Sequence, residues 1–363
     1  MKLKILKSEL VKNIQNVQNI ISSRTNLPIL ANVLIEADLD EVKLTSTDLD
    51  IGIISIFKSE IEEPGAITVP AKRFSDIIKE LPDEDILITT MKNNSMSIKC
   101  GKCFFKILGL PKEDFPKLPD FRKDPHVVID QAGLKKMLSM TCFAMSRDET
   151  RYVLNGALFL FKAGHLIIVT TDGKRLGLIK KETGKDTPDK AIIIPSKTIY
   201  ELNRALGEGG QIKLTFSENQ VRFESENITI ISRLIEGAFP DYEQVIPQES
   251  KEKIVVQREP LLLGIKRAAL LTTQDSQSIK IDVLKNRLVI SKSNPNIGEA
   301  KEELETSYGG HDIAIGFNPS YLIDVLKVVP KDEIAIEISG PDKPAVIRID
   351  DWYVYLVLPM QLA

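Results

Sequence analysis

One short unit recurs three times along this chain of 363 residues, at nearly equal spacing. Each copy is a run of β-branched and apolar residues, then a proline or Phe-Asn-Pro break, then apolar residues at helical spacing. The copies read AITVPAKRFSDIIKELP (66–82), AIIIPSKTIYELNRAL (191–206) and IAIGFNPSYLIDVLKV (313–328). Pro70 and Pro195 are 125 positions apart, and Pro195 and Phe317 are 122 apart. A period of this length predicts that a whole domain is repeated.

Other landmarks keep the same register. A strand and an amphipathic helix open each third, and runs with period-2 alternation close it. The segments VKLTSTD, LIIVTTD and LVISKSN end at Asp48, Asp172 and Asn294, which are 124 and 122 positions apart. We therefore predict an α+β fold of three tandem homologous domains, over residues 1–125, 126–250 and 251–363. Each domain is expected to hold two helices packed on β-sheets. The predicted helices cover residues 9–22, 72–81, 131–146, 196–206, 258–271 and 319–328.

Two proline-containing segments are placed to join the domains. DFPKLPDF (114–121) and AFPDYEQVIP (238–247) end the first two copies and share a Phe-Pro step. Segments of this kind are extended and stiff, so they hold neighbouring domains at a defined spacing. The third copy stops at YLVLPMQLA, where such a segment would begin.

Composition limits the class of protein. A hydrophobic content of 43% with 27% charged residues is that of a soluble globular protein. No apolar run approaches the roughly 18 residues that a membrane span needs, and the start MKLKILKSEL is not a signal peptide. Three cysteines argue against a disulfide-stapled secreted protein. We expect a cytoplasmic protein that does not bind membranes.

Catalytic motifs are weak. CGKC, from Cys100 to Cys103, has the spacing of a redox pair or half a zinc site, but two alternating runs flank it, which favours a two-residue hairpin turn. TTDGKRLG (170–177) lacks the phosphate-loop pattern, and GEGG (207–210) is explained as a helix end and turn. With three histidines in the chain, no acid-base constellation stands out. We predict a non-enzyme without metal or cofactor. An enzyme that uses an unrecognised carboxylate site stays open as an alternative.

The charge of the predicted helices differs from that of the whole chain. These helices carry twelve basic and six acidic residues, whereas the net charge of the chain is −3. Domains with helices on one side and sheets on the other would thus have a basic layer and an acidic layer. A basic layer attracts a phosphate backbone without reading base edges.

Several segments, in order, carry a resemblance over the full length. They are RTNLPILANVLIEA (24–37), RYVLNGALF (151–159), TTDGKRL (170–176), FPDYEQVIP (239–247), GFNPSYLIDVL (316–326) and VLPMQL (357–362). With them the chain resembles the bacterial DNA polymerase III β subunit family, the sliding clamps. The resemblance implies a non-catalytic homodimer in which six domains form a closed head-to-tail ring with pseudo-sixfold symmetry. Such a ring encircles double-stranded DNA topologically, independent of sequence, with its helices lining the hole.

The resemblance also implies partners and site residues. The partners are the polymerase III α subunit, the clamp loader and other proteins with a clamp-binding motif of the Gln-Leu-x-Leu-Phe type. The implied DNA-facing residues are Arg24, Lys79, Arg147, Asp148, Tyr152 and Lys197. The implied dimer contact joins Phe105 and Ile107 to Leu270 and Leu271 of the other subunit. The implied peptide pocket consists of Leu154, Thr171, Gly173, Lys174, Arg175, Leu176, Pro240, Gln244, Val245, Ser276, Asn318, Tyr321, Val346, Leu356, Val357, Leu358, Pro359, Met360, Gln361 and Leu362.

Four of these positions depart from the family pattern. Asp148 stands where a neutral polar residue is expected, and an acid repels phosphate. Lys174 and Gln244 replace larger aromatic or arginine-type residues, and Ser276 replaces a bulky apolar one. We expect docking with altered affinity. A triplicated adaptor that binds peptides without encircling DNA is the second alternative, and it predicts no retention on circular DNA.

Overall fold

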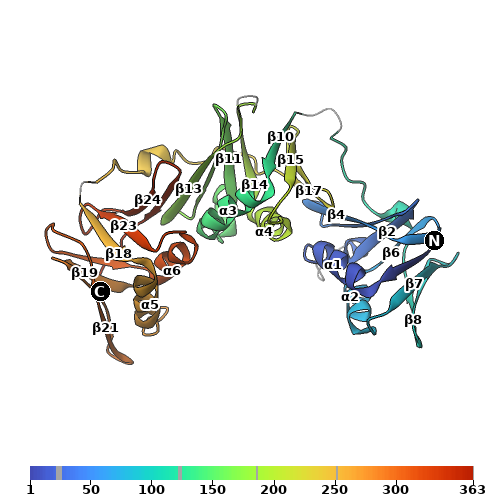
Figure 1. The fold of residues 1–363 in the computed structure, drawn as a ribbon, viewed down its shortest axis with the longest axis horizontal. Coiled ribbons are helices and arrows are strands. Elements are labelled where there is room, and N and C mark those ends of the chain that lie inside the picture. Colours follow the sequence, from blue (N-terminus) through green and yellow to red (C-terminus); the bar gives the residue numbers. More distant parts are fainter. Residues whose placement is uncertain (22–26, 122–124, 185–186, 251, 363) are drawn as a thin grey trace. The chain divides into compact units, whose positions relative to one another are not determined.

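The computed structural model describes residues 1–21, 27–121, 125–184, 187–250 and 252–362. Figure 1 shows these residues as a ribbon coloured along the sequence. The chain divides into two compact units. Unit 1 comprises Met1–Gly133 and Tyr200–Leu234, and unit 2 comprises Leu134–Ile199 and Ile235–Ala363. Because helices α3 (Gln131–Thr141) and α4 (Ser196–Ala205) contain the limits between these ranges, the predicted central domain contributes residues to both units.

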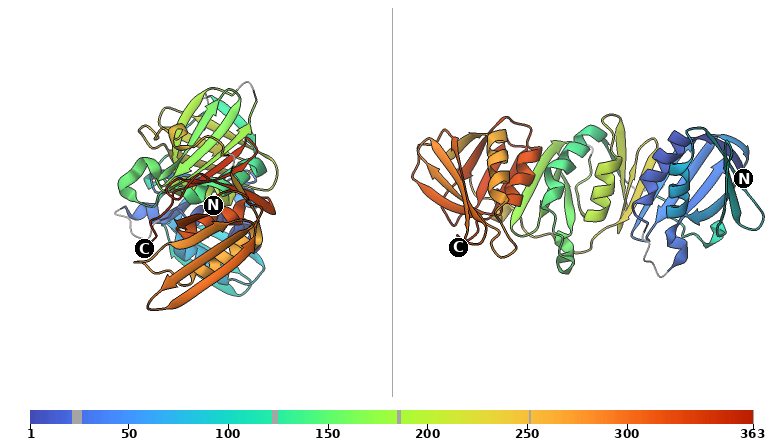
Figure 2. Two further views of the ribbon diagram at one scale, coloured as in Figure 1. Left: turned by 90° about the vertical axis from the view of Figure 1, so that its left-hand side faces the viewer. Right: turned by 90° about the horizontal axis from the view of Figure 1, so that it is seen from below.

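Unit 1 contains two sheets, with strand orders β5-β1-β7-β8-β9 and β10-β15-β16-β17-β4-β3-β2-β6. Its elements are β1 (Lys2–Leu6), α1 (Lys7–Gln18), β2 (Asn32–Asp38), β3 (Glu41–Thr47), β4 (Ile51–Lys58), β5 (Glu60–Glu63), β6 (Gly65–Pro70), α2 (Ala71–Glu80), β7 (Asp85–Thr90), β8 (Ser95–Cys100), β9 (Cys103–Leu108), β10 (His126–Asp130), β15 (Gln211–Phe216), β16 (Gln220–Glu224) and β17 (Ile228–Arg233). Helices α1 and α2 lie side by side (Figure 2), and α1 packs on β3 and β4.

Unit 2 contains sheets with strand orders β14-β11-β12-β13-β25-β24-β23-β18 and β21-β20-β19-β22. Its strands are β11 (Gly156–Lys162), β12 (His165–Thr171), β13 (Arg175–Glu182), β14 (Lys190–Pro195), β18 (Lys253–Gln257), β19 (Ile279–Leu284), β20 (Arg287–Asn294), β21 (Gly298–Glu305), β22 (Ile313–Phe317), β23 (Glu333–Ile338), β24 (Ala345–Ile349) and β25 (Tyr353–Val357). Helices α5 (Arg258–Ala269) and α6 (Pro319–Val328) pack against each other (Figure 2).

The predicted repeat is confirmed in the order of elements. Strand and helix follow each other as β1-α1, β10-α3 and β18-α5, and again as β6-α2, β14-α4 and β22-α6. The helix predicted over 131–146 ends early, at Thr141, and a 3-10 turn over Cys142–Ala144 follows it. The helix predicted over 9–22 begins at Lys7 and ends at Gln18, and residue 22 lies outside the described residues.

The three landmark residues at the ends of their segments share one structural role. The Oδ1 atom of Asp48 accepts hydrogen bonds from the amides of residues 50 and 51, at 3.0 and 2.8 Å. Asp172 does the same for the amides of residues 174 and 175, at 2.9 and 3.0 Å. Asn294 accepts from the amide of residue 296 at 3.0 Å. Short side chains with an oxygen stabilise turns in this way, which explains why Asp or Asn recurs at this step.

In each eight-stranded sheet, one strand pair joins two groups of four strands. We call these two strand pairs the first junction and the second junction. At the first junction, β4 pairs with β17 in unit 1, and at the second, β13 pairs with β25 in unit 2. Successive side chains on a strand point to opposite faces of the sheet. On β3 and β4, Ser46 and Ser55 reach helix α1, since Ser46 donates to the Val17 carbonyl and Ser55 to the Asn13 side chain. Thr45 and the other alternate residues therefore belong to the face away from α1.

The chemical motifs considered in the sequence are turns. Cys100 pairs with Cys103 across a two-residue hairpin in which Gly101 has a φ of +52°, so the hairpin interpretation of CGKC is confirmed. Gly173, with a φ of +84°, lies in the turn between β12 and β13. Among the described residues, no group of three or more His, Cys, Asp or Glu side chains is arranged to hold a metal ion. The described helices are all too short or too polar to cross a bilayer.

Candidate functional site

The C-terminal segment after β25 is fixed to two strands of unit 2. The Leu358 amide donates to the Lys174 carbonyl at 2.8 Å, next to the start of β13. The Met360 amide donates to the Gly316 carbonyl on β22, also at 2.8 Å. A Cβ atom at Gly316 would lie 2.5 Å from the Met360 carbonyl oxygen, so this approach needs glycine. The segment is therefore docked on the sheet up to Met360.

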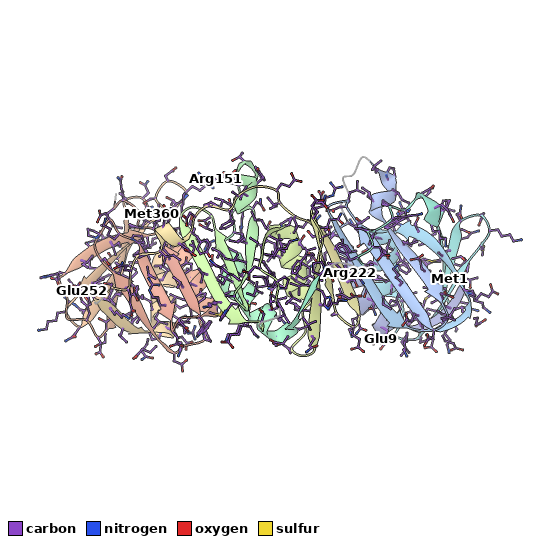
Figure 3. All side chains as sticks on the ribbon, turned by 90° about the horizontal axis from the view of Figure 1, so that it is seen from above. Met1, Glu9, Arg151, Arg222, Glu252 and Met360 are labelled. Atoms are coloured by element: carbon purple, nitrogen blue, oxygen red, sulfur yellow. The ribbon has the colours of Figure 1, made fainter. Side chains whose placement is uncertain are left out.

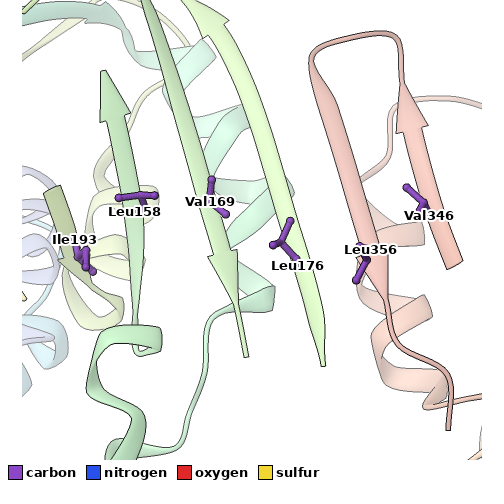
Figure 4. Packing of buried hydrophobic residues seen from close by; sticks show 6 residues of the cluster. All are labelled: Leu158, Val169, Leu176, Ile193, Val346 and Leu356. Carbon is purple, nitrogen blue, oxygen red and sulfur yellow. The ribbon is translucent and has the colours of Figure 1, made fainter. Parts of the chain in front are cut away.

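An apolar cluster fills the face of the second junction (Figure 4). Its buried members come from six strands. They are Leu158, Val169, Leu176, Ile193, Val346 and Leu356. Partly buried apolar residues pack against this cluster, among them Ile235 and, in the joining segment 238–247, Phe239, Tyr242 and Ile246. Leu176 and Val346, two of the predicted pocket residues, are consequently buried in the structure.

Four apolar side chains of the predicted pocket are exposed. Val245 is 53% exposed, and Leu358, Met360 (Figure 3) and Leu362 of the tail are exposed as well. Pro240, Gln244 and Gln361 are also exposed, whereas Leu356 and Val357 are buried in β25. Exposed apolar side chains of this size are available for contact with a partner.

Arg175 organises the polar side of this region. Its guanidinium donates to Asp172 at 3.1 Å and to Asp324 of α6 at 2.7 Å, and it also donates to the Phe143 carbonyl. The guanidinium carbon lies 4.4 Å from the centre of the Tyr321 ring, in a cation–π contact. Burial raises the pKa of the Tyr321 hydroxyl above its usual value. These contacts connect the start of β13 with α6.

Two further predicted pocket residues, Thr171 and Asn318, form hydrogen bonds with nearby backbone groups. The Thr171 hydroxyl donates to the Arg175 carbonyl at 2.6 Å and accepts from the Gly173 amide at 3.0 Å. Asn318 caps α6 by accepting from the Ser320 amide at 3.0 Å.

Two more predicted pocket residues lie in 3-10 segments: Leu154 ends Glu149–Leu154, and Gln244 lies in Glu243–Val245. The Leu154 carbonyl accepts from the Ser146 amide at 3.0 Å. Gln244 donates to Asp241 at 2.7 Å. Ser276 lies in the loop after α5, where its hydroxyl accepts a hydrogen bond from Lys292 at 2.5 Å.

The predicted DNA-facing residues that the structure describes are exposed. Arg147, Asp148 and Tyr152 lie around a 3-10 segment, Glu149–Leu154, and Lys197 lies in the first turn of α4. The Ser196 amide donates to the Asn155 carbonyl at 2.9 Å, which ties the start of α4 to the end of this loop. Lys79 lies on α2 in unit 1, and Arg24 lies outside the described residues.

Asp148 has a structural role that the sequence did not reveal. Its carboxylate accepts from both the Thr150 amide and the Thr150 hydroxyl, at 3.0 and 2.7 Å, and so caps the 3-10 segment. These two hydrogen bonds, followed by the charge of Arg151, lower the pKa of the Asp148 carboxyl. The negative charge is thus partly satisfied within the loop.

Of the four predicted dimer residues, Phe105 and Leu270 are exposed, and Ile107 and Leu271 are half-buried. Strand β9, which carries Phe105 and Ile107, is an edge strand of its sheet. Leu270, directly after α5, is 78% exposed, and Leu271 is half-buried. Phe104 and Leu108 on the same strand, which were not predicted as site residues, are 63% and 72% exposed. Their signal was present, because CFFKIL lacks the polar alternation of a solvent-facing strand.

Comparison with known proteins decides the family. Three family models match consecutively: the N-terminal domain of the DNA polymerase III beta subunit over residues 1–119, its central domain over 128–241 and its C-terminal domain over 243–361. This chain belongs to the DNA polymerase III beta subunit family. The three tandem clamp domains predicted from the repeat are confirmed, while the predicted limits at 125 and 250 stay a prediction.

Relatives of the family match the chain from end to end. The beta sliding clamp of Vibrio cholerae serotype O1 is 34% identical over 366 residues, with 100% of both chains covered. The beta sliding clamp of Chlamydia pneumoniae is 34% identical over 366 residues, covering 100% of this chain and 99% of that one. The crystal structure of the DNA polymerase sliding clamp from Bacillus subtilis matches with a TM-score of 0.93 at 33% identity, over 100% of both chains.

A second solved relative is the DnaN sliding clamp of Pseudomonas aeruginosa bound to griselimycin, with a TM-score of 0.93 at 33% identity over 100% of both chains. Membership in the DNA polymerase III beta subunit family makes this chain a DNA sliding clamp, a non-catalytic processivity subunit. Neither the peptide adaptor nor the enzyme alternative is favoured.

Proposed function

We propose that this sliding clamp acts in the cytoplasm as a homodimeric ring around double-stranded DNA and holds its partners through one pocket per chain at the second junction. The partners are the polymerase III α subunit, the clamp loader and other proteins with a clamp-binding motif. The observation that carries the pocket is the docked tail, whose backbone is bonded to Lys174 and Gly316. A tail held this way presents apolar side chains at a defined place instead of fraying.

Peptide docking follows from what surrounds the tail. Leu and Phe side chains of a motif would rest on Val245, Met360 and Leu362, and would reach the buried cluster where Tyr242 and Ile246 partly cover it. Two or three buried anchors supply roughly 5–8 kcal/mol before the cost of ordering the peptide. A dissociation constant on the order of micromolar is expected. The peptide glutamine would meet the polar edge near Gln244.

Ring closure is proposed at two edge strands of different subunits. Strand β9 exposes Phe104, Phe105 and Leu108, and its neighbourhood carries Lys102 and Lys106. Strand β21, an edge strand of the four-stranded sheet, reads GEAKEELE and is acidic. An unpaired basic and apolar edge fits an unpaired acidic edge, with Leu270 and Leu271 as the apolar contact.

DNA is proposed to contact the exposed basic residues weakly and interchangeably. Lys79, Arg147 and Lys197 supply positive charge, and Tyr152 supplies a ring that is 59% exposed. A clamp that slides is retained by topology, and so it needs few fixed phosphate contacts. Its retention on circular DNA should fall less steeply with salt than that of a groove-binding protein.

Two variants with opposite expected defects test the proposal. Deletion of residues 358–363 should abolish binding of a labelled Gln-Leu-x-Leu-Phe-type peptide and leave the dimer intact, because the tail is remote in sequence from the dimer residues. The double variant Leu270→Asp/Leu271→Asp should sediment as a folded monomer and still bind the peptide, because the pocket lies within one chain. Fluorescence anisotropy and sedimentation, performed on both variants, give the two readouts.

The three parts of the proposal fail separately. Unchanged peptide affinity in a folded deletion dimer would refute the pocket. A dimeric Leu270→Asp/Leu271→Asp variant would refute the interface. Retention on nicked circular DNA that equals retention on the linearised DNA would refute the ring itself.

A further inference from the structure

A groove of about 780 Å³ lies on the face of the first junction, entirely within unit 1. Its floor includes Leu34, Thr45, Ile54, Thr229 and Ile231, and the segment from residue 112 to residue 120 forms its wall. Binding sites for small molecules and peptide segments occupy roughly 300–1,000 Å³. The groove is therefore large enough for a ligand, and the residues proposed above for peptide, dimer and DNA contacts do not line it.

The repeat relates this groove to the second junction residue by residue. The landmarks Asp48 and Asp172 differ by 124 positions. The same offset relates Thr45 to Val169 and Gly52 to Leu176, which belong to the buried cluster of the second junction. A Cβ atom at Gly52 would lie 2.7 Å from a methyl of Leu118. Leu118 of the joining segment therefore comes close to the backbone at Gly52, where the second junction has the side chain of Leu176.

The strand pairing identifies one more pair of equivalent positions in the two junctions. Arg222 lies opposite Ile231, which lies opposite Gly52. Val346 lies opposite Leu356, which lies opposite Leu176. Arg222 (Figure 3) thus takes the place that Val346 has at the second junction. The first junction keeps the architecture of a segment over a continuous sheet, but it is hollow and polar where the second is filled and apolar.

Within the part of the chain that the structure describes, two polar atoms of residues lining this groove have no hydrogen-bond partner. The Thr45 hydroxyl oxygen is buried and unpartnered, in a residue that is 3% exposed. The Nε atom of Arg222 is also buried and unpartnered, while another nitrogen of its guanidinium pairs with Glu224. A buried polar atom without a partner lowers the stability of the folded state. Such atoms are expected where a ligand completes the hydrogen bonds.

The spacing of these atoms favours an extended ligand. Thr45 lies on β3 and Arg222 on β16, with β4 and β17 between them. Three strand spacings of about 4.8 Å place the two backbones roughly 14 Å apart. An extended peptide of four or five residues covers that distance at about 3.3 Å per residue. A small metabolite would reach one of the two atoms but not both.

The charges around the groove favour an acidic ligand. Lys112 and Lys117 lie on the wall and pair with no carboxylate in the part of the chain that the structure describes. Lys43 pairs with Glu36 at 3.5 Å across the sheet, and Glu113 and Asp120 lie on the wall. A peptide carboxylate near Arg222 would accept from the free Nε and gain a charge-assisted hydrogen bond.

We propose that the first junction is a second peptide site, which takes an extended acidic segment of a partner protein in the groove between residues 112–120 and the sheet. Leucine side chains of the segment rest on Ile54 and Ile231. An acidic side chain accepts from Arg222, and a backbone or side-chain group of the segment bonds to Thr45. Each chain then has two docking grooves of different chemistry, one for apolar motifs and one for acidic segments.

The test uses the full-length dimer with isotope-labelled isoleucine methyl groups. The probe is the peptide acetyl-Glu-Leu-Ser-Leu-Glu-amide, in which the acidic ends make the direction of binding unimportant. Saturable shifts are expected at the methyl groups of Ile54 and Ile231, with a dissociation constant on the order of 100 μM. Ile193 and Ile246 report on the second junction and are expected to stay unchanged. The lysine counterpart, acetyl-Lys-Leu-Ser-Leu-Lys-amide, is expected to bind at least tenfold more weakly.

The variant Thr45→Val separates binding from structure. It removes the unpartnered hydroxyl with little change of volume and copies the residue of the second junction. Peptide affinity is expected to fall about fivefold, while the thermal midpoint stays unchanged or rises, because a buried unsatisfied group is removed. Thr89→Val, the same exchange on β7 in the other sheet of unit 1, is the matched control and should leave the affinity unchanged.

Several results would overturn the proposal. These are shifts confined to Ile193 and Ile246, no saturable shift at any of the four methyl groups, equal binding of the lysine peptide, or full affinity in Thr45→Val. Shifts confined to Ile193 and Ile246 would still be consistent with the proposed pocket at the second junction. Two separate sites would be supported by one further result. The variant that lacks residues 358–363 would lose binding of the Gln-Leu-x-Leu-Phe-type peptide, while the acidic peptide would still shift the methyl signals of Ile54 and Ile231 as in the full-length chain.

Discussion

The faces of the two junctions share strand order, ladder register and a covering segment, yet they contain different side chains. At three equivalent places the second junction holds valine, leucine and valine, whereas the first holds Thr45, Gly52 and Arg222. The second face is a filled apolar cluster, and the first leaves a groove of about 780 Å³. Gene repetition has therefore kept the backbone plan while the packing of the face has changed.

The difference teaches which features of a repeated domain are constrained. Ladder hydrogen bonds and the turns capped by Asp48, Asp172 and Asn294 depend on backbone geometry, so all three copies need them. The face beneath a joining segment is constrained only by what that segment and its ligands require. Stability at the second junction comes from buried apolar area, whereas the first junction gives up part of that area and keeps two unpartnered polar atoms.

The largest loss of stability is expected when the arginine found at position 222 of the first junction is placed at the equivalent position of the second junction. Val346→Arg would bury a guanidinium in the apolar cluster, next to Leu356 and Leu176. A buried unpaired charge destabilises by about 3–5 kcal/mol, and overpacking adds to this. Trp352 is the single tryptophan of the chain and lies in unit 2. Urea unfolding followed by its fluorescence should show the loss, and a loss under about 1 kcal/mol would mean that the second face can also accept a polar residue.

A smaller effect is expected from removing side-chain volume. Leu176→Ala opens a cavity in the cluster of the second junction, and buried Leu→Ala changes reduce the free energy of unfolding by about 2–5 kcal/mol. Its counterpart, Gly52→Ala, adds a methyl group that meets the side-chain end of Leu118, which can turn aside. We expect about 1 kcal/mol there. Equal losses in the two variants, the first followed by Trp352 fluorescence and the second by hydrogen exchange of β4 amides, would show that the first face is as tightly packed as the second.

The sequence predicted the features that repeat and missed those that do not. The repeated strand-break-helix unit, the six helices and the hairpin between Cys100 and Cys103 follow from local rules and periodicity, and the described residues confirm them. The early end of α3 at Thr141 was missed because apolar residues continue through the 3-10 turn that follows.

The site was less predictable than the fold. The resemblance supplied the pocket residues, but it did not reveal that Leu176 and Val346 are buried beneath the joining segment. Burial of this kind depends on contacts between residues about 60–110 positions apart, which no local pattern records. The groove of the first junction could not be predicted from the sequence either, because no residue pattern marks an empty volume. Only the departure of Thr45 and Gly52 from their apolar counterparts, read through the repeat, signals it.

The smallest effect is expected for Arg222→Leu, which makes the first junction resemble the second. The change removes the pair with Glu224, and a partly exposed pair of this kind contributes about 0–1 kcal/mol. It also removes the unpartnered Nε atom, whose burial opposes folding by about 1–3 kcal/mol. The two changes oppose each other, and Glu224 is exposed enough for water to solvate it. The free energy of opening of β16 and β17, measured by hydrogen exchange, should therefore stay within about 1 kcal/mol of the parent, or increase. A loss above about 2 kcal/mol would mean that Arg222 holds the joining segment in place, and then the groove would be a structural gap around a buried arginine rather than a surface kept open for a ligand.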